Sequence, residues 1–189
     1  MFQVRFHGRG GQGVVTAAEL LAEAAFRQGR HAQAFPSFGS ERTGAPVVSF
    51  CRISDQPIRI REPILAPDAL IVQDATLLQS IDVFAGLQPD GYVLLNSRHT
   101  FADLGLTEAV APLDPDRSRT VPATEIALEH VGRPLPNAVL LGAFAALYPP
   151  LELEAVLDAV RARFPGAVGE KNVAAATAAH HTVKEAAHA

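Results

Sequence analysis

The sequence predicts an α/β protein with a mixed, mostly parallel central sheet and a Rossmann-like opening unit. Residues Phe2–Phe6 have the composition of a short strand, and from Val14 to Gln28 the apolar residues recur at helical spacing. A glycine cluster separates the two segments. Two short apolar runs, Ala69–Val72 and Tyr92–Asn96, are typical of strands buried on both faces, as in a parallel sheet.

The first half of the chain predicts an antiparallel addition to this sheet. Residues His31–Phe35 are expected to form a second, weak strand. A loop rich in proline and glycine follows, over Pro36–Pro46. Val47–Ile53 and Ile58–Arg61 then alternate around a polar turn, which predicts a hairpin and therefore a mixed sheet.

The second half predicts mainly helices, with further strand candidates at two places. Helices are expected over 75–84, from 122 or 123 to 129, over 138–147, 153–164 and 171–187, and short strands over 110–113 and 119–122. Helix 138–147 is apolar around most of its circumference, which predicts burial. The final helix is rich in alanine and is expected to pack weakly, because each alanine buries little area. No linker or internal repeat is evident, so residues 1–189 are expected to form one domain.

The glycine cluster is the first candidate binding site. Gly8, Gly10 and Gly13 satisfy G-x-G-x-x-G, with Gly11 between them, but the acidic residue expected about 20 positions later in a dinucleotide site is missing. Three interpretations remain: a tight turn for close packing, a loop contacting an anion or a partner, and a dinucleotide site. Arg9 and Gln12 favour the second, because a guanidinium forks onto phosphate or carboxylate and an amide both donates and accepts.

The loop after the second strand is the other candidate. Glu41 and Arg42 are adjacent within it and are either a solvated ion pair or ligand contacts. If strand order brings both loops to the carboxyl edge of the sheet, Arg9 and Arg42 converge where open α/β sheets bind ligands.

Composition narrows the class of protein. The formal net charge is −4 and scattered, and tryptophan is absent, which argues against a nucleic-acid surface. The single cysteine, Cys51, can form neither an internal disulfide nor an iron–sulfur cluster. The start of the chain does not resemble a signal peptide, and no apolar run approaches 18 residues, so a soluble cytoplasmic protein is expected.

No catalytic machinery is evident in the sequence. The adjacent His180 and His181 would point about 100° apart on a helix, and no metal-ligand spacing such as H-E-x-x-H occurs. No G-x-S-x-G elbow is present. The pattern predicts a subunit without catalytic residues or metal of its own, which shapes a site shared with another chain.

Several motifs resemble the gamma subunit of the 2-oxoacid:ferredoxin oxidoreductases of the pyruvate and ketoisovalerate type. The resemblance covers nearly the whole chain in order. It rests on the glycine-cluster motif Gly8–Gly13, on Phe35–Val47, and on the later stretches Pro67–Leu78, Pro136–Ala143 and Glu170–Asn172. The chain departs from the family pattern at Ser40, where proline is common, and at Thr43, where a second arginine is common.

The resemblance implies a three-layer α/β/α domain within a hetero-oligomer. The other subunits would carry thiamine diphosphate and iron–sulfur clusters and would decarboxylate a 2-oxoacid oxidatively to an acyl-CoA. It also implies that two loops face CoA or the partner subunits, through Gly8, Arg9, Gly10, Gly11, Gln12 and Gly13 and through Ser37, Phe38, Gly39, Glu41 and Arg42. The alternative from a different class is a stand-alone dinucleotide-binding module, such as a small reductase, that uses the G-x-G-x-x-G loop.

Overall fold

A six-stranded mixed sheet forms the centre of the molecule. The computed structural model describes residues 1–37 and 43–186. The strand order is β2-β3-β1-β4-β5-β6. The strands are β1 (Phe2–Arg9), β2 (His31–Pro36), β3 (Pro46–Ser54), β4 (Ala69–Val72), β5 (Tyr92–Asn96) and β6 (Ser118–Val121). Strand β3 runs antiparallel to both its neighbours, and β1, β4, β5 and β6 are parallel, which confirms the predicted fold class.

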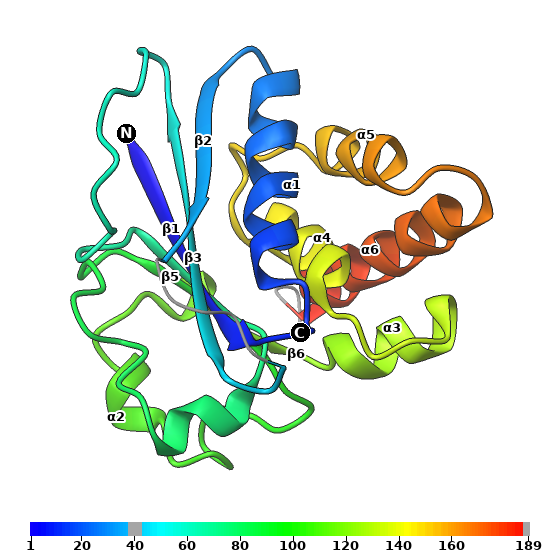
Figure 1. Ribbon diagram of the computed structural model, residues 1–189. Coiled ribbons are helices and arrows are strands. Elements are labelled where there is room, and N and C mark those ends of the chain that lie inside the picture. The colour runs from blue at the N-terminus through cyan, green and yellow to red at the C-terminus, as the bar shows by residue number, and fades with distance from the viewer. Residues whose placement is uncertain (38–42, 187–189) are drawn as a thin grey trace.

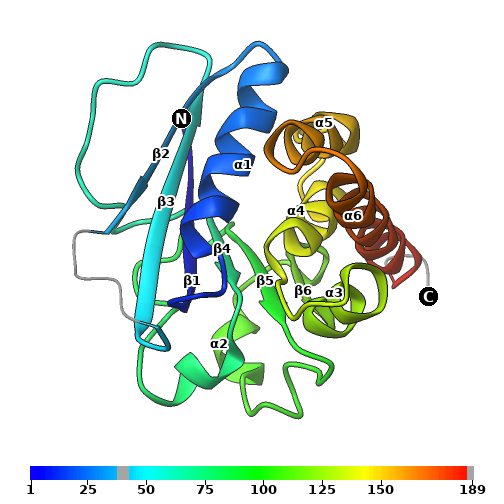
Figure 2. The same ribbon diagram turned by 45° about the vertical axis from the view of Figure 1, so that its right-hand side comes forward.

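The long helices cover one face of the sheet (Figure 1). They are α1 (Val14–Arg27), α3 (Ala123–Val131), α4 (Asn137–Leu147), α5 (Leu153–Arg163) and α6 (Ala167–Ala186). Figure 2 shows α4 between the sheet and α6, and every residue of α4 is buried. Side chains alternate along a strand, so Val4 and Phe6 of β1 face this helical layer and join its core.

Short helical turns and loops cover the opposite face. They include η1 (Ala75–Gln79), α2 (Thr107–Val110) and η2 (Pro115–Arg117), with two small apolar clusters beneath them. This third layer is therefore thinner and less regular than the helical layer.

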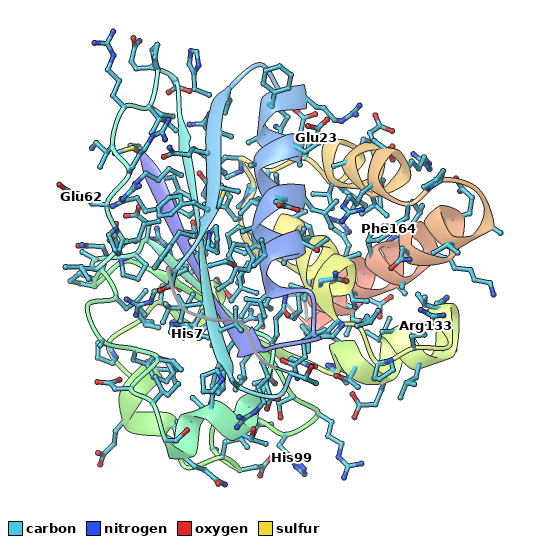
Figure 3. The ribbon with its side chains drawn as sticks, viewed as in Figure 1. His7, Glu23, Glu62, His99, Arg133 and Phe164 are labelled. Carbon is cyan, nitrogen blue, oxygen red and sulfur yellow. The ribbon has the colours of Figure 1, made fainter. Side chains whose placement is uncertain are left out.

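A buried arginine fastens this thin layer to β1. Arg5 donates to the carbonyl oxygens of Val83 at 2.9 Å and Ala85 at 2.6 Å, and its Nε donates to His7 Nε2 at 3.0 Å. Figure 3 shows His7 in the interior. Burial, and secondarily the Arg5 charge, lower the pKa of His7 to about 4, so the imidazole is neutral and accepts this bond.

Three sequence-based predictions are wrong on this side of the molecule. Ile58–Arg61 is not a strand, because β3 already has β1 and β2 on its two edges. The predicted helix over 75–84 is only the short helix η1, which ends at Gln79. The predicted strand over 110–113 does not form: Val110 is the last residue of the short helix α2, and Leu113 belongs to the core of the thin layer.

The expectation of weak packing by the last helix is also wrong. A Cβ built on Gly142 of α4 would lie 2.0 Å from the carbonyl oxygen of Ala176 on α6. The small residues let the two backbones meet, so the alanines act by close approach rather than by area.

Candidate functional site

The two predicted loops meet at the carboxyl end of β1. Gly10 bridges to Thr43, and its N–H donates to the carbonyl oxygen of Ala45 at 2.9 Å. The amide of Gly44 donates back to the carbonyl oxygen of Gly10 at 3.1 Å. The far end of the second loop therefore lies against the glycine cluster.

Part of the predicted site lies outside the described residues. This is so for Phe38, Gly39, Glu41 and Arg42, and hence for the expected convergence of Arg9 and Arg42. Ser37 is described: it is exposed, and its amide donates to the carbonyl oxygen of Val48 at 2.9 Å.

Glycine is required at three positions of the cluster for different structural reasons. A Cβ on Gly8 would lie 2.6 Å from Val14 Cγ2, so glycine allows the start of α1 to approach β1. Gly13 has φ 71°, and a Cβ there would meet Asn137 Nδ2 at 2.5 Å. Gly11 has φ 93° with open space around it, so it supplies only the turn. The cluster therefore serves close packing as well as the loop conformation.

Arg9 reaches across to the segment that follows β4. Its Nε lies 3.3 Å from Asp74 Oδ2, its Nη2 donates to Thr76 Oγ1 at 2.9 Å, and its Nη1 donates to the carbonyl oxygen of Gly44 at 3.1 Å. The Arg9 side chain is 30% exposed. The guanidinium thus holds both loops to the sheet edge, while its remaining surface faces solvent.

Gln12, at the tip of the glycine cluster, adds two hydrogen bonds to this set of contacts. Its Oε1 accepts from the amide of Arg9 at 2.7 Å, and its Nε2 donates to Asp74 Oδ2 at 2.8 Å. We call Arg9, Gln12, Asp74 and Thr76 the loop brace. Asp74 is its centre, because the other three side chains all bond to its carboxylate.

The loop brace keeps Asp74 ionised. Burial alone would raise the pKa of Asp74, but hydrogen bonds from Thr76 and Gln12 and the charge of Arg9 hold that pKa below its usual range. The carboxylate also accepts from the Thr76 amide at 2.9 Å and so caps η1. A braced loop with a fixed charge is a preorganised surface.

A polar pocket of about 320 Å³ opens beside the loop brace, at the carboxyl ends of β4 and β5. Its charged side chains are Asp74, Glu125 and Arg98, so the pocket is not uniformly positive. Its uncharged polar side chains are Gln12, Gln73, Asn96, Ser97 and Thr124.

Sequence reasoning missed Asp74, Gln73 and Asn96 as site residues. A usable signal is present: Gln73 and Asn96 continue, at period two, the helix-facing apolar stripes of β4 and β5 that include Ile71 and Leu94. A polar residue that ends a buried strand in this way points to the carboxyl-edge crevice.

The described residues contain neither a helix suited to span a membrane nor a cluster suited to hold a metal ion. Among the helices of residues 1–37 and 43–186, none combines the length and apolar character needed to cross a bilayer. Over the same residues, no group of three or more histidine, cysteine or acidic side chains is arranged to hold a metal ion.

Comparison with known proteins identifies the family. The model of the family "Pyruvate ferredoxin/flavodoxin oxidoreductase" matches residues 3–182. The chain belongs to this family.

Its relatives in the family match over nearly their whole length. It is 47% identical over 184 residues to pyruvate synthase subunit PorC of Methanothermobacter marburgensis, covering 97% of this chain and 98% of the relative. It is 48% identical over 178 residues to the pyruvate/ketoisovalerate oxidoreductases common subunit gamma of Thermococcus kodakarensis, covering 93% and 94%. The crystal structure of pyruvate oxidoreductase subunit PORC from Thermotoga maritima superposes with a TM-score of 0.79 at 35% identity, covering 95% of each chain.

These findings confirm the predicted identity as a gamma-type subunit of a multi-subunit 2-oxoacid oxidoreductase. The alternative, a stand-alone dinucleotide-binding module, finds no support among these relatives.

Proposed function

We propose that this gamma-type subunit, acting as one domain over residues 1–189, lends its carboxyl edge to a CoA-facing site in a cytoplasmic oxidoreductase. The complex would convert a 2-oxoacid to an acyl-CoA, with thiamine diphosphate and iron–sulfur clusters carried by partner subunits. The glycine cluster Gly8–Gly13 and the loop over 37–42 would form a rim facing CoA, near the thiamine diphosphate. The chain by itself would not catalyse the reaction.

The loop brace is the observation that carries this proposal. A glycine turn that served packing alone would not need an arginine and an amide converging on one partly buried carboxylate. Holding a loop in its bound conformation lowers the ordering cost of binding, which is the use we assign to the brace. The exposed part of the Arg9 guanidinium is the anion contact this edge offers to a phosphate.

The cofactor chemistry is assigned to the partner subunits. Thiamine diphosphate would supply the carbanion chemistry and the clusters would accept the electrons. Cys51, the single cysteine of this chain, is fully buried on β3, and burial raises the pKa of its thiol. A buried, protonated thiol does not fit the role of a cluster ligand, so the role left to this chain is to bind and orient.

Replacing Arg9 with alanine tests this function in the assembled complex. We expect the KM for CoA to rise about tenfold, because one charge-assisted contact to a phosphate is worth roughly 1.4 kcal/mol. The kcat should stay within about twofold, because the reacting groups lie on other chains. The measurement is steady-state kinetics with CoA as the varied substrate, and size-exclusion chromatography checks assembly.

Arg133→Ala is the matched control. Arg133 is exposed at the end of α3, and Figure 3 shows it at the periphery. Normal assembly of the Arg9 variant with unchanged CoA kinetics would remove the phosphate role. Loss of assembly would instead show that the glycine cluster contacts protein alone.

A further inference from the structure

The side chain of Gln73 has no bonding partner in the described part of the molecule. Gln73 is 1% exposed, yet neither its Nε2 nor its Oε1 has a hydrogen-bond partner there. It lines the polar pocket, on the helix-facing side of the end of β4. Buried amide groups are almost always bonded, so an orphaned pair facing a pocket needs an explanation.

The uncharged polar side chains Asn96, Thr124 and Gln12, which line the same pocket, already have hydrogen-bond partners other than Gln73. Asn96 Nδ2 donates to Thr124 Oγ1 at 2.8 Å, and Asn96 Oδ1 accepts from the Thr124 amide at 3.1 Å. Gln12 is held within the loop brace. The backbone of Gln73 is also satisfied, by the carbonyl oxygen of His7 at 2.7 Å and by Asn96 Nδ2 at 2.8 Å. These three side chains and the Gln73 backbone are therefore satisfied, whereas the Gln73 carboxamide has no partner among the described residues.

The chemistry of the pocket selects the kind of group that would fit. A carboxamide presents a donor and an acceptor side by side. Because the N–H and C=O of one trans amide point in opposite directions, the complement is the C=O of one amide and the N–H of a neighbouring amide in the same chain. Among the described lining residues, two carboxylates, Asp74 and Glu125, outnumber the one cation, Arg98, and so disfavour a polyanion. None of the described residues that line the pocket is aromatic, so they offer no platform for a stacked base.

The geometry points to this pocket as the binding site of a chain that carries uncharged amides, with Gln73 Nε2 donating to the carbonyl oxygen of one amide and Gln73 Oε1 accepting from the N–H of the next. The naming of the ligand rests on the proposed function: CoA carries amides in its pantetheine arm. The phosphates of CoA would then lie outside the pocket, toward Arg9.

The experiment is a titration of the full-length chain followed by NMR. Pantetheine supplies the amides without nucleotide or phosphates, and adenosine 3′,5′-bisphosphate supplies the nucleotide without amides. We expect pantetheine to shift the side-chain NH₂ resonance of Gln73 with saturation, and the bisphosphate to leave this resonance in place. Gln73→Met, which keeps the length and removes both polar atoms, should weaken pantetheine binding at least tenfold.

Two further measurements distinguish ligand binding by Gln73 from a structural role of its side chain. Gln33→Met is the matched control. Gln33 on β2 also has a buried Oε1 without a partner in the described residues, but it does not line the pocket. The Gln33→Met protein should therefore bind pantetheine as the wild type does. In urea unfolding, Gln73→Met should be at least as stable as the wild type, because it removes an unsatisfied group from the ligand-free protein.

Pantetheine that fails to shift Gln73, or that binds Gln73→Met with unchanged affinity, would overturn the amide site. A clear loss of stability in Gln73→Met would do so as well, because the carboxamide would then have a structural partner. If pantetheine binds at Gln73 while Gln73→Met and Arg9→Ala leave the CoA kinetics of the complex unchanged, the amide site stands and the CoA-facing function fails.

Discussion

Replacing Asp74 with alanine is expected to raise the KM for CoA in the assembled complex by tenfold or more and to lower the free energy of unfolding by about 2–3 kcal/mol. Asp74 is the common partner of Arg9, Gln12 and Thr76, and its side chain is only 15% exposed. Its removal leaves the Arg9 guanidinium and the Gln12 amide without their shared partner and releases the glycine cluster from the segment that follows β4. The measurements are CoA kinetics of the complex and urea unfolding of the chain.

The pH dependence of this effect has a defined sign. The folded-state pKa of Asp74 lies below its usual value of 3.8. The carboxylate therefore stabilises the fold fully above that value, and the contribution is lost as the pH falls through the lower folded-state pKa. The stability difference between wild type and Asp74→Ala should be constant from pH 5 to 8 and should shrink only in stronger acid.

Asp103→Ala is the matched control for Asp74→Ala. Asp103 accepts from the amide and hydroxyl of Thr100 much as Asp74 accepts from those of Thr76, but it is exposed and contacts no arginine among the described residues. It should leave the CoA kinetics unchanged. Equal effects of the two substitutions would show that Asp74 acts only as a local cap.

Gly142→Leu is expected to cost more than about 3 kcal/mol of stability, the largest loss on the helical side of the sheet. Helix propensity alone predicts a gain of up to about 1 kcal/mol when glycine is replaced within a helix. The steric term opposes this gain and is larger, because even a Cβ at this position would lie 2.0 Å from the carbonyl oxygen of Ala176. Urea unfolding followed by circular dichroism measures the net result.

Ala174→Leu is the control for Gly142→Leu, because it adds a leucine to a helix without placing it in a contact between helices. Ala174 lies on the exposed side of α6, so the larger side chain extends into solvent and stability should change by less than about 0.5 kcal/mol. A Gly142→Leu protein as stable as the wild type would mean that α4 and α6 do not pack as closely as the structure shows.

The sheet centre was predictable because its sequence pattern is local. Ala69–Val72 and Tyr92–Asn96 are short apolar runs bounded by polar residues, and both are strands at the expected positions. The failed hairpin at Ile58–Arg61 shows the limit of such patterns. Alternation correctly indicated a strand at β3. Its pairing partners are the preceding strand β2 and the more distant β1, and this choice is not written in the alternation itself.

The candidate site was predictable only in part, for the same reason. The glycine cluster identified the loop and its unusual residues Arg9 and Gln12. Their partner Asp74 lies 62 positions beyond Gln12, so no local pattern connects them. Gln73 was hidden for a further reason, because a polar residue after an apolar run looks like an ordinary strand end until its burial is known.

Hydrogen–deuterium exchange of the assembled complex, with and without CoA, tests most directly the claim that this chain's carboxyl edge faces CoA. We expect CoA to slow exchange in residues 8–13 and 73–76 and to leave exchange in the helices α5 and α6 unchanged. Slower exchange confined to the partner subunits, with both segments of this chain unaffected, would contradict this claim.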